Sequence, residues 1–143
     1  MGASSSVVGK NVFVSFEQTC DENLKQQFIN HIESLSYHVI NKDFINQANL
    51  SFIETDDIKS QILIANYVVI FISKNTINSH TQIFVDHVST QNNKNIIYMI
   101  MEESFLPVRN TAIKKFIGNN VSYPCYTQNT IEYSLNKLSN KFV

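Results

Sequence analysis

The sequence is poor in the residues that build phosphate loops, metal centres and disulfide frameworks. Glycine occurs only three times in 143 residues, so the Gly-rich turns of Rossmann and P-loop proteins cannot form between strands and helices. The two cysteines, Cys20 and Cys125, lie far apart and form neither a CxxC pair nor a zinc-type His/Cys pattern. No apolar run approaches the roughly 18 residues that a membrane-spanning helix needs.

Charge is also scarce, and the two signs are balanced. The chain has 11 basic and 12 acidic residues, and its densest basic spot is the pair Lys114–Lys115. Because a nucleic-acid-binding surface normally shows as a basic patch, we expect no nucleic-acid partner. No secretory signal precedes the first expected strand, so we expect a cytoplasmic protein in a reducing compartment.

The most informative stretch that is present is NYVVIFIS, residues Asn66–Ser73. Six consecutive apolar residues without polar alternation are typical of a strand that is buried on both faces at the centre of a parallel sheet. Asn95–Met101 (NIIYMIM) forms a second such run. Shorter strands are expected at 11–16, 37–40 and 121–126, with helices at 21–35, 51–65, 81–90, 112–117 and 128–142. We expect Gly118 to stop the short helix before it, and Pro124 to lie on an edge strand.

Alternating strands and helices of this kind predict an α/β fold with a parallel sheet and right-handed crossovers. Five strands favour the flavodoxin-like order 2-1-3-4-5, with helices on both faces, and the loops at the carboxyl ends of the strands as the ligand site. The length indicates one domain, which we assign to residues 11–143, preceded by a flexible leader at 1–10.

The leader contains a candidate lipidation site. Gly2 and Ser6 fit the N-myristoylation pattern M-G-x-x-x-[ST], and the alternative is an unmodified flexible segment. One myristoyl chain binds membranes only marginally, and no polybasic stretch is present to reinforce it. The pattern therefore predicts weak, peripheral membrane contact at most.

Three stretches of the chain resemble motifs of the TIR (Toll/interleukin-1 receptor) domain family. NVFVSF (Asn11–Phe16), followed by a polar loop and a helix, looks like the family's first strand, which ends in F-[IV]-S-[YF]. IESLSYHVINKDF (Ile32–Phe44) is similar to its second strand and following loop, and IETDDIKSQILIANYVVIFISKNTINS (Ile53–Ser79) resembles its second helix and central strand. The resemblance covers about residues 11–101, beyond which only the order of elements agrees.

The resemblance implies two different functions. Many TIR domains are interaction modules that associate with other TIR domains in immune or stress signalling, and others cleave NAD with a Glu on the third helix in a [WC]-x-x-E setting. In this chain the Glu position falls on Val85, with Asp86 next to it. Asp86 is therefore the candidate catalytic residue, and the alternative is a solvated helix residue. Neither function requires a cofactor, since NAD would be the substrate.

The same resemblance, together with the positions of the strand ends, predicts two further groups of site residues. Candidate ligand-binding residues are Phe16, Glu17, Lys42, Asp43 and Ser79. The loop after the second strand mediates assembly in relatives, so the candidate interface residues are Phe44, Ile45 and Asn46. Phe44 could instead pack on the edge of the domain, and Glu17 could simply face water.

No metal site is expected. His80 and His87 are seven residues apart, whereas zinc-binding pairs on helices favour a spacing of four, so we interpret both as surface residues. A phospho-acceptor receiver domain would share the fold, but it needs an acidic pair after the first strand and an Asp at the end of the third. Here those strands end in Ser15-Phe16-Glu17 and Ile72-Ser73, which favours the TIR-like interaction module and leaves NAD cleavage as the alternative.

Overall fold

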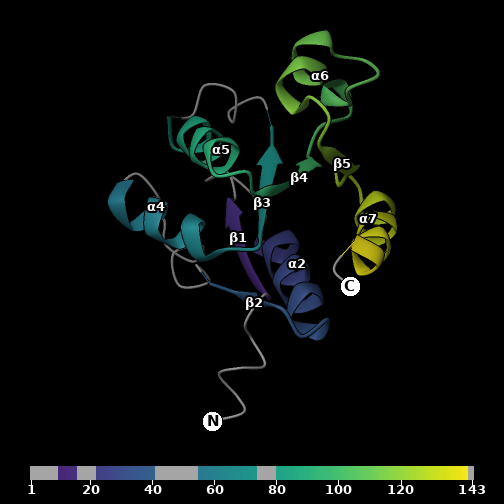
Figure 1. The fold of residues 1–143 in the computed structure, drawn as a ribbon. Coiled ribbons are helices and arrows are strands. Elements are labelled where there is room, and N and C mark those ends of the chain that lie inside the picture. The colour runs from purple at the N-terminus through teal and green to yellow at the C-terminus, as the bar shows by residue number, and fades with distance from the viewer. Residues whose placement is uncertain (1–9, 16–21, 41–54, 74–79, 142–143) are drawn as a thin grey trace.

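Five parallel strands form the centre of the molecule, as the computed structural model shows for residues 10–15, 22–40, 55–73 and 80–141 (Figure 1). Every neighbouring pair is parallel, and the order is β2-β1-β3-β4-β5. The predicted flavodoxin-like α/β fold is therefore confirmed. The strands are β1 (Asn11–Ser15), β2 (His38–Val39), β3 (Tyr67–Ile72), β4 (Asn95–Ile100) and β5 (Val121–Pro124).

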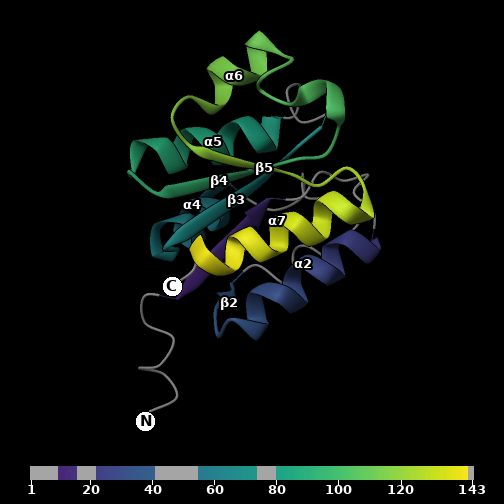
Figure 2. The ribbon, with the colours of Figure 1, turned by 90° about the vertical axis from the view of Figure 1, so that its right-hand side faces the viewer.

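Helices cover both faces of this sheet (Figures 1 and 2). They are α2 (Glu22–Ser34), α4 (Thr55–Ile64), α5 (His80–Gln91), α6 (Thr111–Ile117) and α7 (Gln128–Lys141), with a short 3-10 turn η2 (Glu103–Phe105). Residues of α2 and α7 join one core cluster, and residues of α4, α5 and α6 join the other. Within the described part of the chain, none of these helices is both long and apolar enough to cross a membrane.

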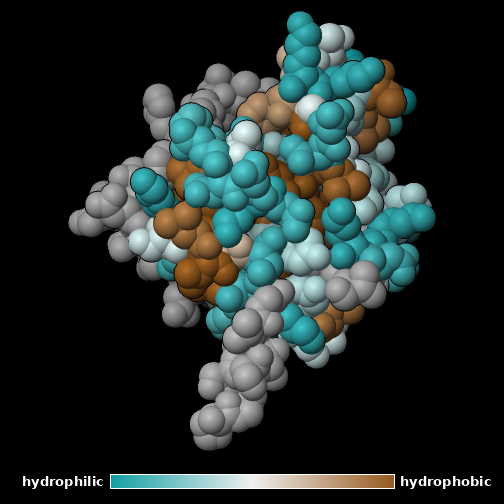
Figure 3. All heavy atoms as spheres, viewed as in Figure 1, coloured by the Kyte–Doolittle hydropathy of each residue, from teal (hydrophilic) through white to brown (hydrophobic). Residues whose placement is uncertain are grey.

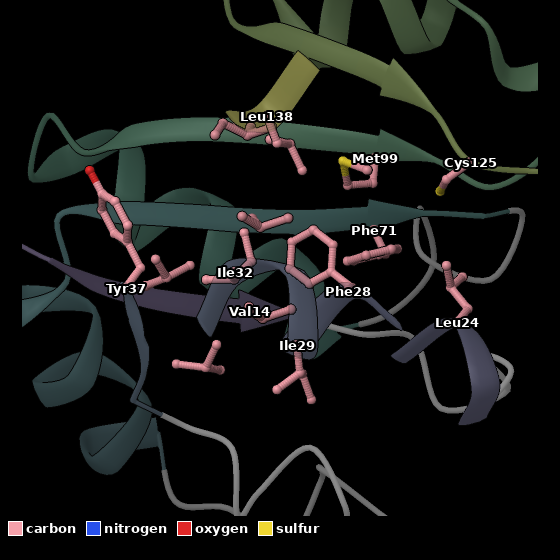
Figure 4. Close-up of a cluster of buried hydrophobic side chains, with 14 residues drawn as sticks. Val14, Leu24, Phe28, Ile29, Ile32, Tyr37, Phe71, Met99, Cys125 and Leu138 are labelled. Atoms are coloured by element: carbon pink, nitrogen blue, oxygen red, sulfur yellow. The ribbon is translucent and has the colours of Figure 1, made fainter. Parts of the chain in front are cut away.

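Strand β3 belongs to both core clusters at once. Successive side chains alternate between the two faces, so that Val69 and Phe71 face α2 and α7, while Val68, Ile70 and Ile72 face the other helices. All five are fully buried, which confirms the two-sided burial predicted from the run of apolar residues. On the α2 face, the rings of Phe28 and Phe71 meet edge to face with centroids 5.2 Å apart (Figure 4).

Both edges of the sheet are blunted. At one edge, β2 pairs through only two residues, His38 and Val39. At the other edge, Pro124 has no backbone N–H, and its carbonyl accepts a hydrogen bond from the buried Ser134 hydroxyl of α7. Pro124 thus lies on an edge strand, as predicted. Short strands, proline and covered carbonyls are the devices that prevent strand-to-strand association.

The ends of α6 show why a helix forms at this point in the chain. The Asn110 side chain accepts a hydrogen bond from the Ile113 N–H at 3.1 Å and caps the first turn. At the other end Gly118 adopts φ +62°, a conformation that residues with a Cβ rarely adopt, and its N–H donates to the Lys114 carbonyl. The predicted stop at Gly118 is therefore confirmed, and the Asn110 cap places the helix start at Thr111.

Candidate functional site

The candidate catalytic residue, Asp86, lies halfway along α5 and faces the middle of β4. Its Oδ1 atom accepts a hydrogen bond from the Tyr98 hydroxyl of β4. Asp86 is half-buried, whereas Tyr98 is only 1% exposed. Asp86 is therefore only partly solvated, and its carboxylate accepts the hydrogen bond of a buried phenol, which needs an acceptor.

Tyr98 connects this carboxylate to a third element. Its ring meets the Phe116 ring of α6 edge to face, with centroids 5.6 Å apart. Tyr98 also belongs to the core cluster beneath α4, α5 and α6. One side chain of β4 thus packs against α6 with its ring and bonds to α5 with its hydroxyl. A buried tyrosine of this kind has an apolar body and one polar group that needs a partner.

Burial changes the protonation equilibria of both groups. Loss of water raises the pKa of the Asp86 carboxyl, although the Tyr98 hydrogen bond and the nearby His87 act in the opposite direction. Burial and the adjacent carboxylate together raise the pKa of Tyr98 far above its usual range. Tyr98 therefore remains a hydrogen-bond donor at every physiological pH, and Asp86 is the acceptor.

Val85, onto which the resemblance places the family's catalytic Glu, faces the core. It is 1% exposed and packs in the same cluster as Tyr98. Adjacent residues of a helix point about 100° apart, so the Asp86 side chain does not point into the core as Val85 does. It instead contacts the hydroxyl group of Tyr98. A carboxylate at Val85 would be buried among aliphatic side chains, where ionisation is costly.

The other predicted site residues fall outside the part of the chain that the structure describes. These are Gly2, Phe16, Glu17, Lys42, Asp43, Phe44, Ile45, Asn46 and Ser79. His87 is described, and it is exposed, as expected for a surface residue. Among the described residues, no group of three or more His, Cys, Asp or Glu side chains could hold a metal ion.

Sequence reasoning missed Tyr98 as the partner of Asp86. The residue stands in the strand NIIYMI, where every other interior side chain is aliphatic or Met. A tyrosine in a strand that is buried on both faces must find a partner for its hydroxyl, and that requirement was a usable signal. The sequence could not show which helix would supply the acceptor.

No model of a known protein family matches the chain, and no curated protein matches its sequence. Support for a function therefore comes from the fold and from the geometry of α5.

We predict that Tyr98→Phe lowers the free energy of unfolding by about 1–2 kcal/mol, because it leaves the half-buried Asp86 carboxylate without its donor. The loss should shrink in an Asp86→Ala background, where no carboxylate remains to be satisfied. Urea unfolding of both single variants and the double variant measures this coupling. Tyr133→Phe, which changes an exposed tyrosine of α7, is the matched control and should cost less than about 0.5 kcal/mol. Equal losses for Tyr98→Phe in both backgrounds would contradict the pairing.

The raised pKa of Asp86 predicts a pH dependence of stability. The folded protein holds this proton more tightly than the unfolded chain, whose Asp has a pKa of about 4. The stabilisation that comes from protonated Asp86 is complete below the pKa of the unfolded state. It is lost as the pH rises through the higher pKa of the folded state. Asp86→Asn removes this loss, so its stability relative to wild type should increase between about pH 4 and pH 7. Urea midpoints across this range measure the trend, and a constant or decreasing difference would show that burial does not raise this pKa.

Proposed function

We propose that the chain is a TIR-like interaction module that acts by association with like domains in immune or stress signalling. Two features support the proposal. The sheet has the flavodoxin-like order β2-β1-β3-β4-β5 that five alternating strands and helices predict for such a domain. The observation that carries most weight is the pairing of Asp86 with Tyr98, because it gives this carboxylate a packing role.

The geometry of α5 favours association over catalysis. A catalytic carboxylate must reach the reacting group of its substrate, directly or through one water. Val85 is enclosed in the core, and Asp86 is bonded to a phenol that is itself buried. In the described part of α5, the two residues closest to the family's Glu position thus serve the packing of the helix.

The blunted sheet edges bear on how association would occur. Since β2 is only two residues long and the Pro124 carbonyl is occupied, addition of a strand from another molecule is disfavoured. Loops and helix faces remain as contact surfaces. The loop after β2, with Phe44, Ile45 and Asn46, stays the proposed interface, and it lies outside the described residues.

NAD cleavage is the second candidate, and one observation favours it. A half-buried carboxyl group with a raised pKa is a common feature of reaction centres. In that case Asp86 would stabilise the oxocarbenium-like ribose, and the loops with Phe16, Glu17, Lys42, Asp43 and Ser79 would bind the nucleotide. The Tyr98 hydrogen bond would then have to open or serve to orient the carboxylate.

We expect Ile45→Asp and Phe44→Ala to weaken self-association, because a new charge or a lost apolar contact in an interface reduces affinity. Sedimentation velocity over a wide concentration range measures the effect. Val108→Asp is the matched control, since Val108 is 89% exposed on the loop between β4 and α6 and a charge there has no core contact to disturb.

The same preparations separate the two candidate functions. A folded, self-associating protein should leave NAD intact, and Asp86→Asn should associate as wild type does. Sedimentation that is independent of concentration would refute the interaction module. NAD consumption that Asp86→Asn abolishes without unfolding the protein would establish the enzyme instead.

A further inference from the structure

Three lysines that are far apart in the sequence lie at the amino edge of the sheet, where the strands begin. Lys10 directly precedes β1, and its carbonyl accepts the His38 N–H of β2 at 2.8 Å. Lys94 directly precedes β4. Lys141 ends α7, and its carbonyl lies 3.5 Å from the Tyr67 hydroxyl at the start of β3. The topology thus places at one edge of the sheet three lysines that are 84 and 47 positions apart in the sequence.

Two exposed apolar side chains lie beside one of these lysines, Lys94. Leu63 and Ile64, at the end of α4, are 47% and 60% exposed. The Lys94 Nζ atom donates to the carbonyls of Leu63 and Ala65 at 2.8 and 2.9 Å. Figure 3 shows hydrophobic atoms at the surface over the C-terminal end of α4. We call the set Lys10, Leu63, Ile64, Lys94 and Lys141 the amino-edge surface.

The Asn11 side chain fixes the relation between the first strand and this helix end. Its Nδ2 atom lies 3.4 Å from the Ile64 carbonyl, and its backbone N–H donates to the Asn66 side chain at 3.0 Å. Asn11 directly follows Lys10, so β1 begins beside the helix end that carries the exposed pair Leu63 and Ile64. Positive charge and apolar surface share one side of the molecule.

The charge on this edge is not balanced by the carboxylates around it. Glu33 is the only acidic side chain that the described residues place near the beginnings of the strands. The Lys94 ammonium group binds carbonyls rather than carboxylates, whereas the ion pairs Lys25–Glu22 and Arg109–Glu103 follow the carboxyl ends of β1 and β4. The amino edge thus carries net positive charge in a chain whose total is -1.

We propose that the amino-edge surface docks on an anionic lipid bilayer. Lysines near a membrane surface are attracted by acidic headgroups, and neighbouring exposed aliphatic side chains can enter the interface between headgroups and acyl chains. The chain has no polybasic stretch, but the fold places three lysines from distant parts of the sequence at one edge of the sheet. An acyl chain on Gly2 would join the protein at this same edge through Lys10, so the surface provides the second signal that a single lipid needs.

Vesicle co-sedimentation with the unacylated protein tests the proposal. Binding should be stronger to vesicles that contain phosphatidylserine than to pure phosphatidylcholine, and it should weaken as salt is added. Each neutralised lysine in Lys10→Gln and Lys141→Gln should weaken partitioning roughly five-fold. Ile64→Ser should weaken it on the same vesicles. These changes leave the Lys94 contacts with the end of α4 in place.

Lys115→Gln and Val108→Ser are the matched controls, since both residues are exposed on or beside α6, away from the amino edge (Figure 1). They should bind vesicles as wild type does. Binding that ignores lipid charge, or that falls equally in the controls, would overturn the proposal, as would an absence of vesicle binding. The result is independent of self-association, which sedimentation without lipid reports separately.

Discussion

Burial of β3 on both faces is the constraint on which the rest of the structure depends. A strand whose five residues from Val68 to Ile72 are all excluded from water cannot lie at the surface or at an edge. It needs a paired strand on each side and a helical layer above and below, and β1, β4 and the two groups of helices meet these needs. The parallel order then follows from the alternation of strands and helices.

This constraint also determines what α5 can do. The helix covers the face of the sheet to which Ile70, Ile72 and Tyr98 point, and Val85 completes that layer of the core. Tyr98 brings the only phenol into this cluster of buried residues, so a neighbouring helix must supply an acceptor, and Asp86 does so. The acidic residue closest to the family's catalytic position is thus engaged by the same packing that holds α5 on the sheet.

Local patterns predict the strands and helices well, because each depends on a few adjacent residues. The apolar runs predicted β3 and β4, and Gly118 predicted the end of α6. Pro124 predicted that β5 lies at an edge of the sheet. Pairs that form only when distant elements meet could not be predicted. Asp86 meets Tyr98 across a helix, a turn and part of a strand, and Asn11 meets Ile64 only through the order of the sheet.

The most direct test of the central claim, that Asp86 belongs to the packing of the fold, is an NMR titration of isotope-labelled protein with NAD. The signals to follow are the Asp86 side-chain carboxyl carbon and the Tyr98 ring, which are hydrogen-bonded partners. We predict that saturating NAD leaves both signals unchanged. A shift of the Asp86 carboxyl signal on addition of NAD would show that the carboxylate faces a ligand and would contradict this account.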